Sequence, residues 1–289
     1  MIRFDSLALN DRLLQAVRDA GYSEPTAIQA QAIPPILAGR DVFGCAQTGT
    51  GKTAAFVLPM VQRLAAAPAP RGPRAIRALV LSPTRELATQ ISDAVESFGR
   101  PFGLERTVVF GGVSAMPQRR ALRRGIDVLV ATPGRLEDLM RERAVDLRRV
   151  EVVVLDEADR MLDQGFFPAV RRILATVPRE RQTLLFSATM PEEIRALGRS
   201  FQRDAVEIKV TPSATPAEKV EQEVLFVARE DKRGLLLHLL EDPAVTRALV
   251  FTRTRRGADR VAKHLAGKVG VDAIHGDRSQ SQRERALAG

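Results

Sequence analysis

Residues 46–53 constrain the fold of this chain most, because they read Ala-Gln-Thr-Gly-Thr-Gly-Lys-Thr and open a helical stretch over Ala54 to Leu64. Small residues let the backbone wrap closely around a phosphate, and successive N–H groups then form an anion-binding nest at a helix start. The pattern fits the P-loop, with Ala46 where the first glycine usually stands. An ordinary turn rich in Gly and Thr is the alternative, but the Gly-Lys-Thr ending favours nucleotide binding.

The P-loop pattern assigns roles within the segment. Lys52 is expected to reach the β- and γ-phosphates, and the Thr53 hydroxyl is expected to hold Mg²⁺. The remaining backbone would surround the phosphates. The predicted nucleotide-binding residues of this segment are Ala46, Gln47, Thr48, Gly49, Thr50, Gly51, Lys52 and Thr53.

The composition is that of a basic chain without a membrane-spanning pattern. Its 44 basic and 35 acidic residues give a net charge of +9, which favours a polyanionic partner. The single cysteine, Cys45, excludes an internal disulfide and is expected to be a small packing residue. No apolar run reaches the length of a membrane span, and the N-terminus lacks the hydrophobic core of a signal peptide. A cytoplasmic location is therefore expected.

Short apolar runs alternate with segments of helical spacing along the chain. Such runs are typical of buried parallel strands, and β/α alternation predicts an α/β fold with a parallel sheet covered by helices on both faces. Ligands of such folds bind beyond the carboxyl ends of the strands. The predicted strands of this part are residues 78–82, 106–110, 127–131, 152–155, 183–187 and 205–210, and predicted helices include 86–98 and 135–141.

Two Pro-rich segments indicate connections. Residues 68–73 are predicted to form a surface loop, and residues 211–218 are predicted to link a domain at 1–210 to a second part at 219–289. The β/α alternation restarts after the linker, but three strands do not complete a domain of the first one's size. In this second part the predicted strands are 223–227, 248–252 and 271–275, and the predicted helices are 232–240, 256–265 and 280–288.

Carboxylates follow the apolar run Val152–Leu155, where the sequence reads Asp156-Glu157-Ala158-Asp159. A buried strand that ends in acids places them at the sheet edge that faces the phosphates. An NTPase needs a Mg²⁺-binding acid there and a residue that orients or deprotonates water. Acids after a strand are also common helix N-caps, but a P-loop in the same domain favours the catalytic interpretation.

This Asp-Glu-Ala-Asp segment and several further motifs make the chain resemble the DEAD-box RNA helicases, here taken to be of the bacterial type. The motifs occur in the order of that family and cover essentially the whole chain. The resemblance implies a RecA-like P-loop domain, part of a second RecA-like domain, ATP and Mg²⁺ as cofactors, and RNA as partner. The matching segments are 21–29 with the upstream aromatic Phe4, 83–88, 111–112, 132–135, 187–189, 250–254, 275–277 and 280–283.

The resemblance also assigns nucleotide-site roles. Gln29 is similar to the glutamine that reads the adenine edge, and Tyr22 would stack on the adenine face unless it is simply a packing residue. Asp156 would hold Mg²⁺ through water, Glu157 would be the base for the attacking water, and Asp159 would link the site to the Ser-Ala-Thr segment. The residues predicted to act in catalysis are Lys52, Asp156, Glu157, Asp159, Ser187 and Thr189.

The remaining motifs are similar to those that grip the sugar-phosphate backbone of RNA in this family. Hydroxyls, backbone N–H groups and arginines suit phosphate, and none of them reads base identity. Arg119, Arg120, Arg123 and Arg124 could extend this basic surface, but a solvated helix face is favoured. The predicted RNA-binding residues are Thr84, Arg85, Gly111, Gly112, Thr132, Gly134, Arg135, Thr254, Gly276 and Asp277.

One departure from the family pattern bears on activity. The sequence contains no counterpart of motifs V and VI, whose arginines complete the ATP site in this family, so we expect these 289 residues to bind ATP but to be impaired in hydrolysis and unwinding. A non-catalytic module that binds ATP and RNA is the main alternative. A DNA translocase is a weaker one, because the glutamine motif and Ser187-Ala188-Thr189 argue against it.

Overall fold

The computed structural model describes residues 2–66, 75–210, 221 and 223–288, so the predicted loop at 68–73 and linker at 211–218 lie outside the described residues. The chain separates into two units, Met1–Ser213 and Ala214–Gly289, which are described one at a time.

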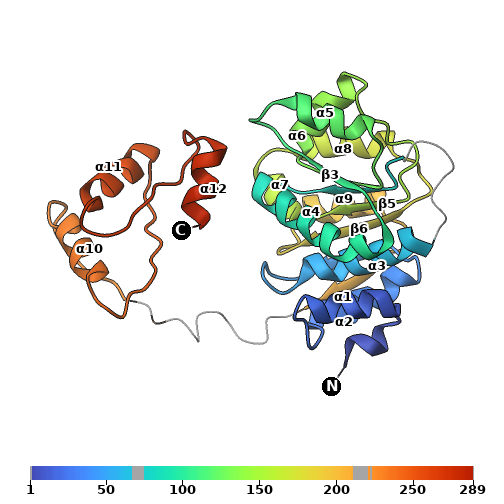
Figure 1. The fold of residues 1–289 in the computed structure, drawn as a ribbon, viewed down its shortest axis with the longest axis horizontal. Helices are drawn as coiled ribbons and strands as arrows, with labels where there is room; N and C mark the ends of the chain where they lie inside the picture. Colours follow the sequence, from blue (N-terminus) through green and yellow to red (C-terminus); the bar gives the residue numbers. More distant parts are fainter. Residues whose placement is uncertain (1, 67–74, 211–220, 222, 289) are drawn as a thin grey trace. The chain divides into compact units, whose positions relative to one another are not determined.

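The first unit is built on a seven-stranded sheet with the order β3-β4-β2-β5-β6-β1-β7 (Figure 1). Every neighbouring pair is parallel, which confirms the predicted parallel sheet. The strand β1 was not predicted; it has only four residues, but a P-loop normally follows a strand, and that rule would have found it. The strands are β1 (Val42–Cys45), β2 (Ala78–Leu81), β3 (Arg106–Val109), β4 (Val128–Ala131), β5 (Val152–Leu155), β6 (Gln182–Ser187) and β7 (Val206–Lys209).

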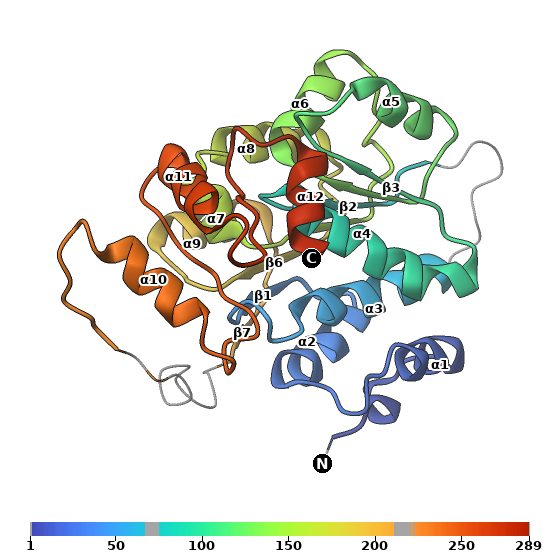
Figure 2. The same cartoon turned by 60° about the vertical axis from the view of Figure 1, so that its left-hand side comes forward.

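Helices cover both faces of this sheet (Figure 2). Side chains alternate along each strand, so Ala78 and Val80 of β2 join one buried cluster, whereas Leu79 and Leu81 join the other. The first cluster includes residues of α1 to α4, and the second includes residues of α6 to α9. The helices are α1 (Asp11–Asp19), α2 (Ala27–Leu37), α3 (Lys52–Ala66), α4 (Arg85–Gly99), α5 (Ala115–Arg123), α6 (Pro133–Arg141), α7 (Ala158–Asp163), α8 (Phe167–Thr176) and α9 (Glu192–Phe201).

The strand order sorts the predicted motifs into two halves of one sheet edge. The strands β3, β4 and β2 are neighbours, and their carboxyl ends lead into the segments predicted to bind RNA. The strands β5, β6 and β1 are also neighbours, and theirs lead into the acidic segment, the Ser-Ala-Thr segment and the P-loop. The two halves meet where β2 pairs with β5.

The second unit contains α10 (Lys232–Leu240), α11 (Arg255–Leu265) and α12 (Gln280–Ala288), which confirm the three predicted helices. The predicted strands at 223–227, 248–252 and 271–275 were wrong, since none forms in the described residues. Parallel strands need both faces covered. Here Phe226 and Phe251 are 97% and 91% exposed, and Leu265 is the only buried apolar residue among those described in this unit. None of the helices in the described ranges has the length and apolar character of a membrane span.

Candidate nucleotide and nucleic-acid site

The P-loop joins β1 to α3 and needs glycine at two places. Gly49 and Gly51 have φ angles of +85° and +90°, which favour glycine. A Cβ atom on Gly51 would also lie only 2.5 Å from Nε2 of Gln29. At the other end of the loop, the Ala46 N–H donates to the Ser187 carbonyl at 3.0 Å, which ties the loop to β6.

Lys52 is the first residue of α3 and is only 5% exposed. Its Nζ atom is buried and has no hydrogen-bond partner among the described residues. A buried ammonium without a partner is costly, and an anion at the loop would satisfy it. The residues present therefore fit a nucleotide phosphate.

Asp156 and Glu157 follow β5 and are each 3% exposed. Burial raises the pKa of Asp156 to about 6; Lys52 opposes the rise, and the Glu157 carboxylate adds to it. Among the described residues no group of three His, Cys, Asp or Glu side chains could hold a metal. Mg²⁺ usually binds through one or two carboxylates, phosphate oxygens and water, and the Asp156 carboxylate and the Thr53 hydroxyl are oxygen ligands of the kind that such a site uses.

Glu157 has both carboxylate oxygens engaged. Its Oε1 accepts a hydrogen bond of 2.9 Å from the Thr48 hydroxyl, and its Oε2 accepts one of 2.8 Å from Nη1 of Arg160. The backbone of Glu157 is left-handed, with φ 51° and ψ 53°, an uncommon conformation for this residue type that clusters at functional sites. Arg160 was not among the predicted residues, although its position three residues after Glu157 on α7 was an available signal.

Asp159 joins the acidic segment to the Ser-Ala-Thr segment. Its Oδ2 accepts hydrogen bonds from the N–H of Ala188 at 3.1 Å and from the N–H and hydroxyl of Thr189 at 2.8 and 3.1 Å. Its own N–H donates to the Ser187 hydroxyl at 3.2 Å. Burial works to raise the pKa of Asp159, but the hydrogen bonds from Thr189 and its other donors hold it below its ordinary value. The structure thus brings together the residues predicted to couple the two segments.

Gln29 holds the P-loop as well as its own helix. Its Oε1 accepts from the Thr26 N–H at 2.9 Å in a capping box at the start of α2, and its Nε2 donates to the Gly51 carbonyl at 3.1 Å. The Thr-x-x-Gln spacing was the signal for this capping role. One N–H hydrogen and one lone pair of the amide remain for an adenine edge.

Tyr22 lies among the aromatic residues of its own unit. Its ring stacks on Phe4 with centroids 6.4 Å apart and tilts against Phe98 at 6.2 Å. The side chain is nevertheless 42% exposed. Tyr22 therefore has the packing role that was the alternative to adenine stacking. The exposed part of its ring remains available to a ligand.

Two of the segments predicted to bind RNA are in direct contact. Thr84 caps α4 by accepting from the Leu87 N–H at 3.3 Å. Arg85 then lies against Gly112, because a Cβ atom built on that glycine would be 1.8 Å from Nη2 of Arg85. Gly112 also has a φ of +74°. The left-handed backbone favours glycine at this position, and a side chain there would displace the Arg85 guanidinium.

The predicted RNA-binding segment at residues 132–135 contacts Val113, which directly follows the glycine segment at residues 111–112. Thr132 lies at the N-cap of α6, and Arg135 in the first turn donates from Nη2 to the Val113 carbonyl at 2.8 Å. Nη1 of Arg135 is buried without a partner among the described residues. At Gly134 an added Cβ would meet nothing within 4 Å. This edge therefore offers an unpaired guanidinium donor and a helix N-terminus, both suited to phosphate.

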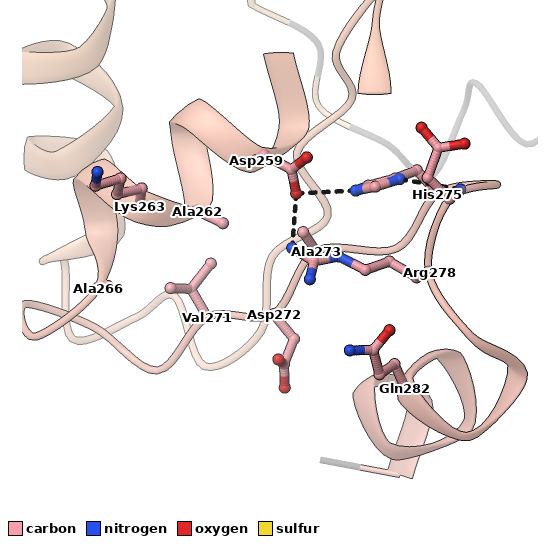
Figure 3. Close-up of a pocket in the computed structure, with 11 residues that line it drawn as sticks. Asp259, Ala262, Lys263, Ala266, Val271, Asp272, Ala273, His275, Arg278 and Gln282 are labelled. Carbon is pink, nitrogen blue, oxygen red and sulfur yellow. Dashed lines mark hydrogen bonds and ion pairs between the residues drawn. The ribbon is translucent and has the colours of Figure 1, made fainter. Parts of the chain in front are cut away.

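In the second unit the three predicted residues lie around Arg255. Thr254 caps α11 by accepting from the Gly257 N–H at 3.0 Å, Asp277 accepts from Nη1 of Arg255 at 2.5 Å, and a Cβ on Gly276 would lie 3.4 Å from the same guanidinium. A pocket of about 680 Å³ lies beside them (Figure 3). Within it, Asp259 Oδ1 pairs with His275 Nε2 at 2.9 Å and with Arg278 Nη2 at 2.6 Å.

A parallel sheet with a P-loop, a buried cation and an acid pair at its carboxyl edge defines a P-loop nucleotide-binding protein. Residues 26–197 match the sequence profile described as DEAD/DEAH box helicase, and the chain belongs to this family.

Two curated relatives and a solved structure agree with this family assignment. The chain is 41% identical to DEAD-box ATP-dependent RNA helicase 30 of Arabidopsis thaliana, over 100% of the chain and 49% of the relative. It is 42% identical to DEAD-box ATP-dependent RNA helicase 52A of Oryza sativa subsp. japonica, over 98% of the chain and 51% of the relative. The crystal structure of a DEAD box protein from the hyperthermophile Methanococcus jannaschii superposes with a TM-score of 0.67 at 35% identity, covering 100% of the chain and 77% of that structure. The chain spans about half the length of the curated relatives it matches.

Proposed function

We propose that the protein is an ATP-dependent RNA helicase, in which RNA-stimulated ATP hydrolysis drives local, non-processive unwinding of RNA duplexes. The observation that carries this proposal is the division of one sheet edge between a half built for nucleotide and a half built for a polyanion. The contact of Asp159 with the Ser-Ala-Thr segment supports coupling between hydrolysis and unwinding. Both relatives are named as RNA helicases.

In the nucleotide half, Lys52 balances the charge of the β- and γ-phosphates, and Gln29 selects adenine while holding Gly51. Glu157 takes the proton of the attacking water on a free lone pair of one carboxylate oxygen, while Thr48 and Arg160 hold the carboxylate in place. Mg²⁺, held by Asp156 through water and by Thr53, would neutralise charge that develops on the phosphates.

In the nucleic-acid half, the first unit supplies donors to a phosphate backbone from the segments after β2, β3 and β4. Such contacts give affinity without sequence preference, and 2′-hydroxyl contacts would distinguish RNA from DNA. In the second unit, Thr254, Gly276 and Asp277 are also proposed to contact RNA. A bacterial subtype and a cytoplasmic location are part of the same proposal.

These 289 residues alone are proposed to bind ATP and RNA but to hydrolyse ATP slowly. The support is that the relatives are about twice as long and that an arginine supplied from outside the P-loop domain typically accelerates phosphoryl transfer by ~10³–10⁵. Closure of two domains by ATP and RNA requires that both ligands favour the closed state.

The test is a multiple-turnover ATPase assay of the 289-residue chain and of a longer form that reaches the length of the relatives, each with RNA, with DNA and without nucleic acid. RNA should stimulate the longer form strongly and the 289-residue chain little. Equal stimulation by DNA would favour a translocase, and RNA binding without turnover in the longer form would favour a non-catalytic module.

A further inference from the structure

The glycine loop, residues 110–113, lies between the end of β3 and the start of α5 and is fixed at both ends. At its first residue, Nε2 of Gln118 donates to the Phe110 carbonyl at 3.1 Å. At its last residue, Nη2 of Arg135 donates to the Val113 carbonyl at 2.8 Å. Two side chains from different helices therefore set the course of this short backbone segment.

Between the Phe110 and Val113 carbonyls, the backbone has N–H groups that can act as hydrogen-bond donors to a ligand. Among the described residues, no acceptor is found for the N–H groups of Gly111, Gly112 and Val113. Successive free N–H groups in a glycine segment form an anion-binding nest, and Gly112, with φ +74°, has the left-handed backbone that such a nest uses. The geometry of the loop therefore suits one phosphate, provided that its carbonyls are held away from the anion.

Gln118 is placed to hold them. It lies on α5, is 8% exposed, and is the only residue that α5 buries. Its Oε1 is buried without a partner among the described residues. The buried position of this side chain therefore lowers the stability of the fold. Proteins accept a buried polar atom without a partner mainly at functional positions, where a local loss of stability is tolerated.

We propose that Gln118 is a positioning residue for RNA binding, which holds the Phe110 carbonyl so that the N–H groups of Gly111 and Gly112 remain free for one RNA phosphate. This inference rests on the proposed function, because it deepens the RNA role assigned to the two glycines. Gln118 itself touches no RNA and carries no charge. Its removal should therefore weaken binding without changing the number of cations that RNA releases.

The experiment compares the 289-residue chain with Gln118→Met, which keeps the length and volume of the side chain but removes the donor. Affinity for a labelled ten-nucleotide oligouridine is measured by fluorescence anisotropy between 50 and 200 mM NaCl, and backbone amide resonances are followed by NMR. The variant should bind about tenfold more weakly with an unchanged salt slope. RNA should shift the Gly111 and Gly112 resonances only in the unmutated chain, while Thr84 and Gly134 respond in both.

Gln202→Met is the matched control. Nε2 of Gln202 also donates to backbone carbonyls, those of Val42 at 2.8 Å and Thr183 at 3.0 Å, but at the opposite end of the sheet. The Gln202→Met variant should bind RNA with the same affinity as the unmutated chain and should show the same response of the Gly111 and Gly112 resonances. Gln118→Glu, which has the same shape but carries a carboxylate without a donor at pH 7, should lose the glycine response in the same way.

Three results are decisive. Equal affinity and equal glycine shifts in Gln118→Met and the unmutated chain would overturn the inference. So would an equal loss of affinity in Gln202→Met, because the effect would then be one of general stability. Failure of the unmutated chain to bind oligouridine at 50 mM NaCl would instead count against the proposed function and would be seen before any variant is made.

Discussion

The hydroxyl of Thr48 donates a hydrogen bond of 2.9 Å to Oε1 of Glu157, although the two residues are 109 positions apart in the chain. The P-loop and the proposed base are therefore joined without any ligand. Arg160 occupies the other oxygen of the same carboxylate at 2.8 Å. Each oxygen still keeps a second lone pair, so Glu157 can accept a proton from water while both contacts hold its carboxylate in place.

Replacing Glu157 by Gln should separate nucleotide binding from hydrolysis. The amide keeps the shape of the side chain but cannot act as a base, so in the longer form of the protein turnover should fall by about 10²–10⁴-fold while ATP still binds. A coupled ATPase assay and fluorescent nucleotide titration measure the two effects. Glu180→Gln, on an exposed residue near the other end of the sheet, is the control. Normal turnover in Glu157→Gln would mean that another group is the base.

Lys52→Ala should weaken nucleotide binding itself. The loss of a charge-assisted contact with phosphate should lower ADP affinity by roughly ten- to a hundred-fold. Without nucleotide, unfolding in urea should show little loss of stability, because the buried Nζ makes no hydrogen bond among the described residues and acts on Asp156 only through its charge. Lys209→Ala, at an exposed lysine on β7, should change neither quantity. ADP affinity that survives in Lys52→Ala would remove Lys52 from the site.

Gln29→Ala should have two effects, because one amide serves two purposes. The unmutated protein should prefer ADP over GDP by about ten- to a hundred-fold, since guanine presents an acceptor where adenine presents a donor, and the variant should lose most of this preference. Loss of the capping contact with Thr26 should also cost about 1 kcal/mol of stability. Titrations with both nucleotides and urea unfolding give the two numbers. Equal affinity for ADP and GDP in the unmutated protein rules out the adenine role.

Asp156 should make the stability of the first unit depend on pH. Its pKa rises from 3.8 to about 6 on folding, so the folded state binds more protons than the unfolded state between about pH 4 and pH 6. The stability contributed at Asp156 is therefore present below about pH 4 and is lost as the pH rises through 6. Without Mg²⁺ or nucleotide, Asp156→Asn should be the more stable protein at pH 7, by on the order of 3 kcal/mol. Urea unfolding from pH 4 to pH 8 tests this, and a constant difference between the two proteins would contradict it.

Gly112→Ala and Gly111→Ala form a matched pair. At Gly112 a Cβ atom would collide with the Arg85 guanidinium and the backbone is left-handed, whereas at Gly111 an added Cβ meets nothing within 4 Å. The first variant should lose about 1–2 kcal/mol of stability and the second much less. Arg85 should be displaced only in the first, so its RNA affinity should fall further. Indistinguishable unfolding curves for the two variants would refute the contact.

The first unit was predictable because its signals are local and agree with one another. The run Val152–Leu155 followed by acids defines a central strand, and the P-loop lies at the same sheet edge, two strands away. The strand β1 escaped because Gly44, a residue that is depleted in strands, interrupts its short apolar run. In the second unit the pattern indicated strands, but strands form only when partners and cover are present, and Phe226 and Phe251 remain exposed there.

Prediction of the candidate site was limited in the same way, by interactions that depend on tertiary packing. Motif order placed Asp159 near Thr189, and the structure has that contact at 2.8 Å. Side chains that act through long-range packing gave no comparable signal. The burial of Gln118 against the Phe110 carbonyl depends on how α5 lies on β3, and the second role of Gln29 depends on a loop 22 residues away. Periodicity along the chain does not contain either relationship.

The pairing of the strands also sets an order of assembly during synthesis. The strands β2, β3 and β4, with the segments predicted to bind RNA, come from one continuous stretch that ends at Arg135. The strand β1 has no such early neighbour, since Val42 pairs only with Leu184 and Val206. Pairing over so long a sequence separation is slow and has to wait for the ribosome to release the later strand. A nascent chain can therefore pair the strands that carry the predicted RNA-binding segments first, whereas the strand before the P-loop gains its neighbours only after β6 has emerged.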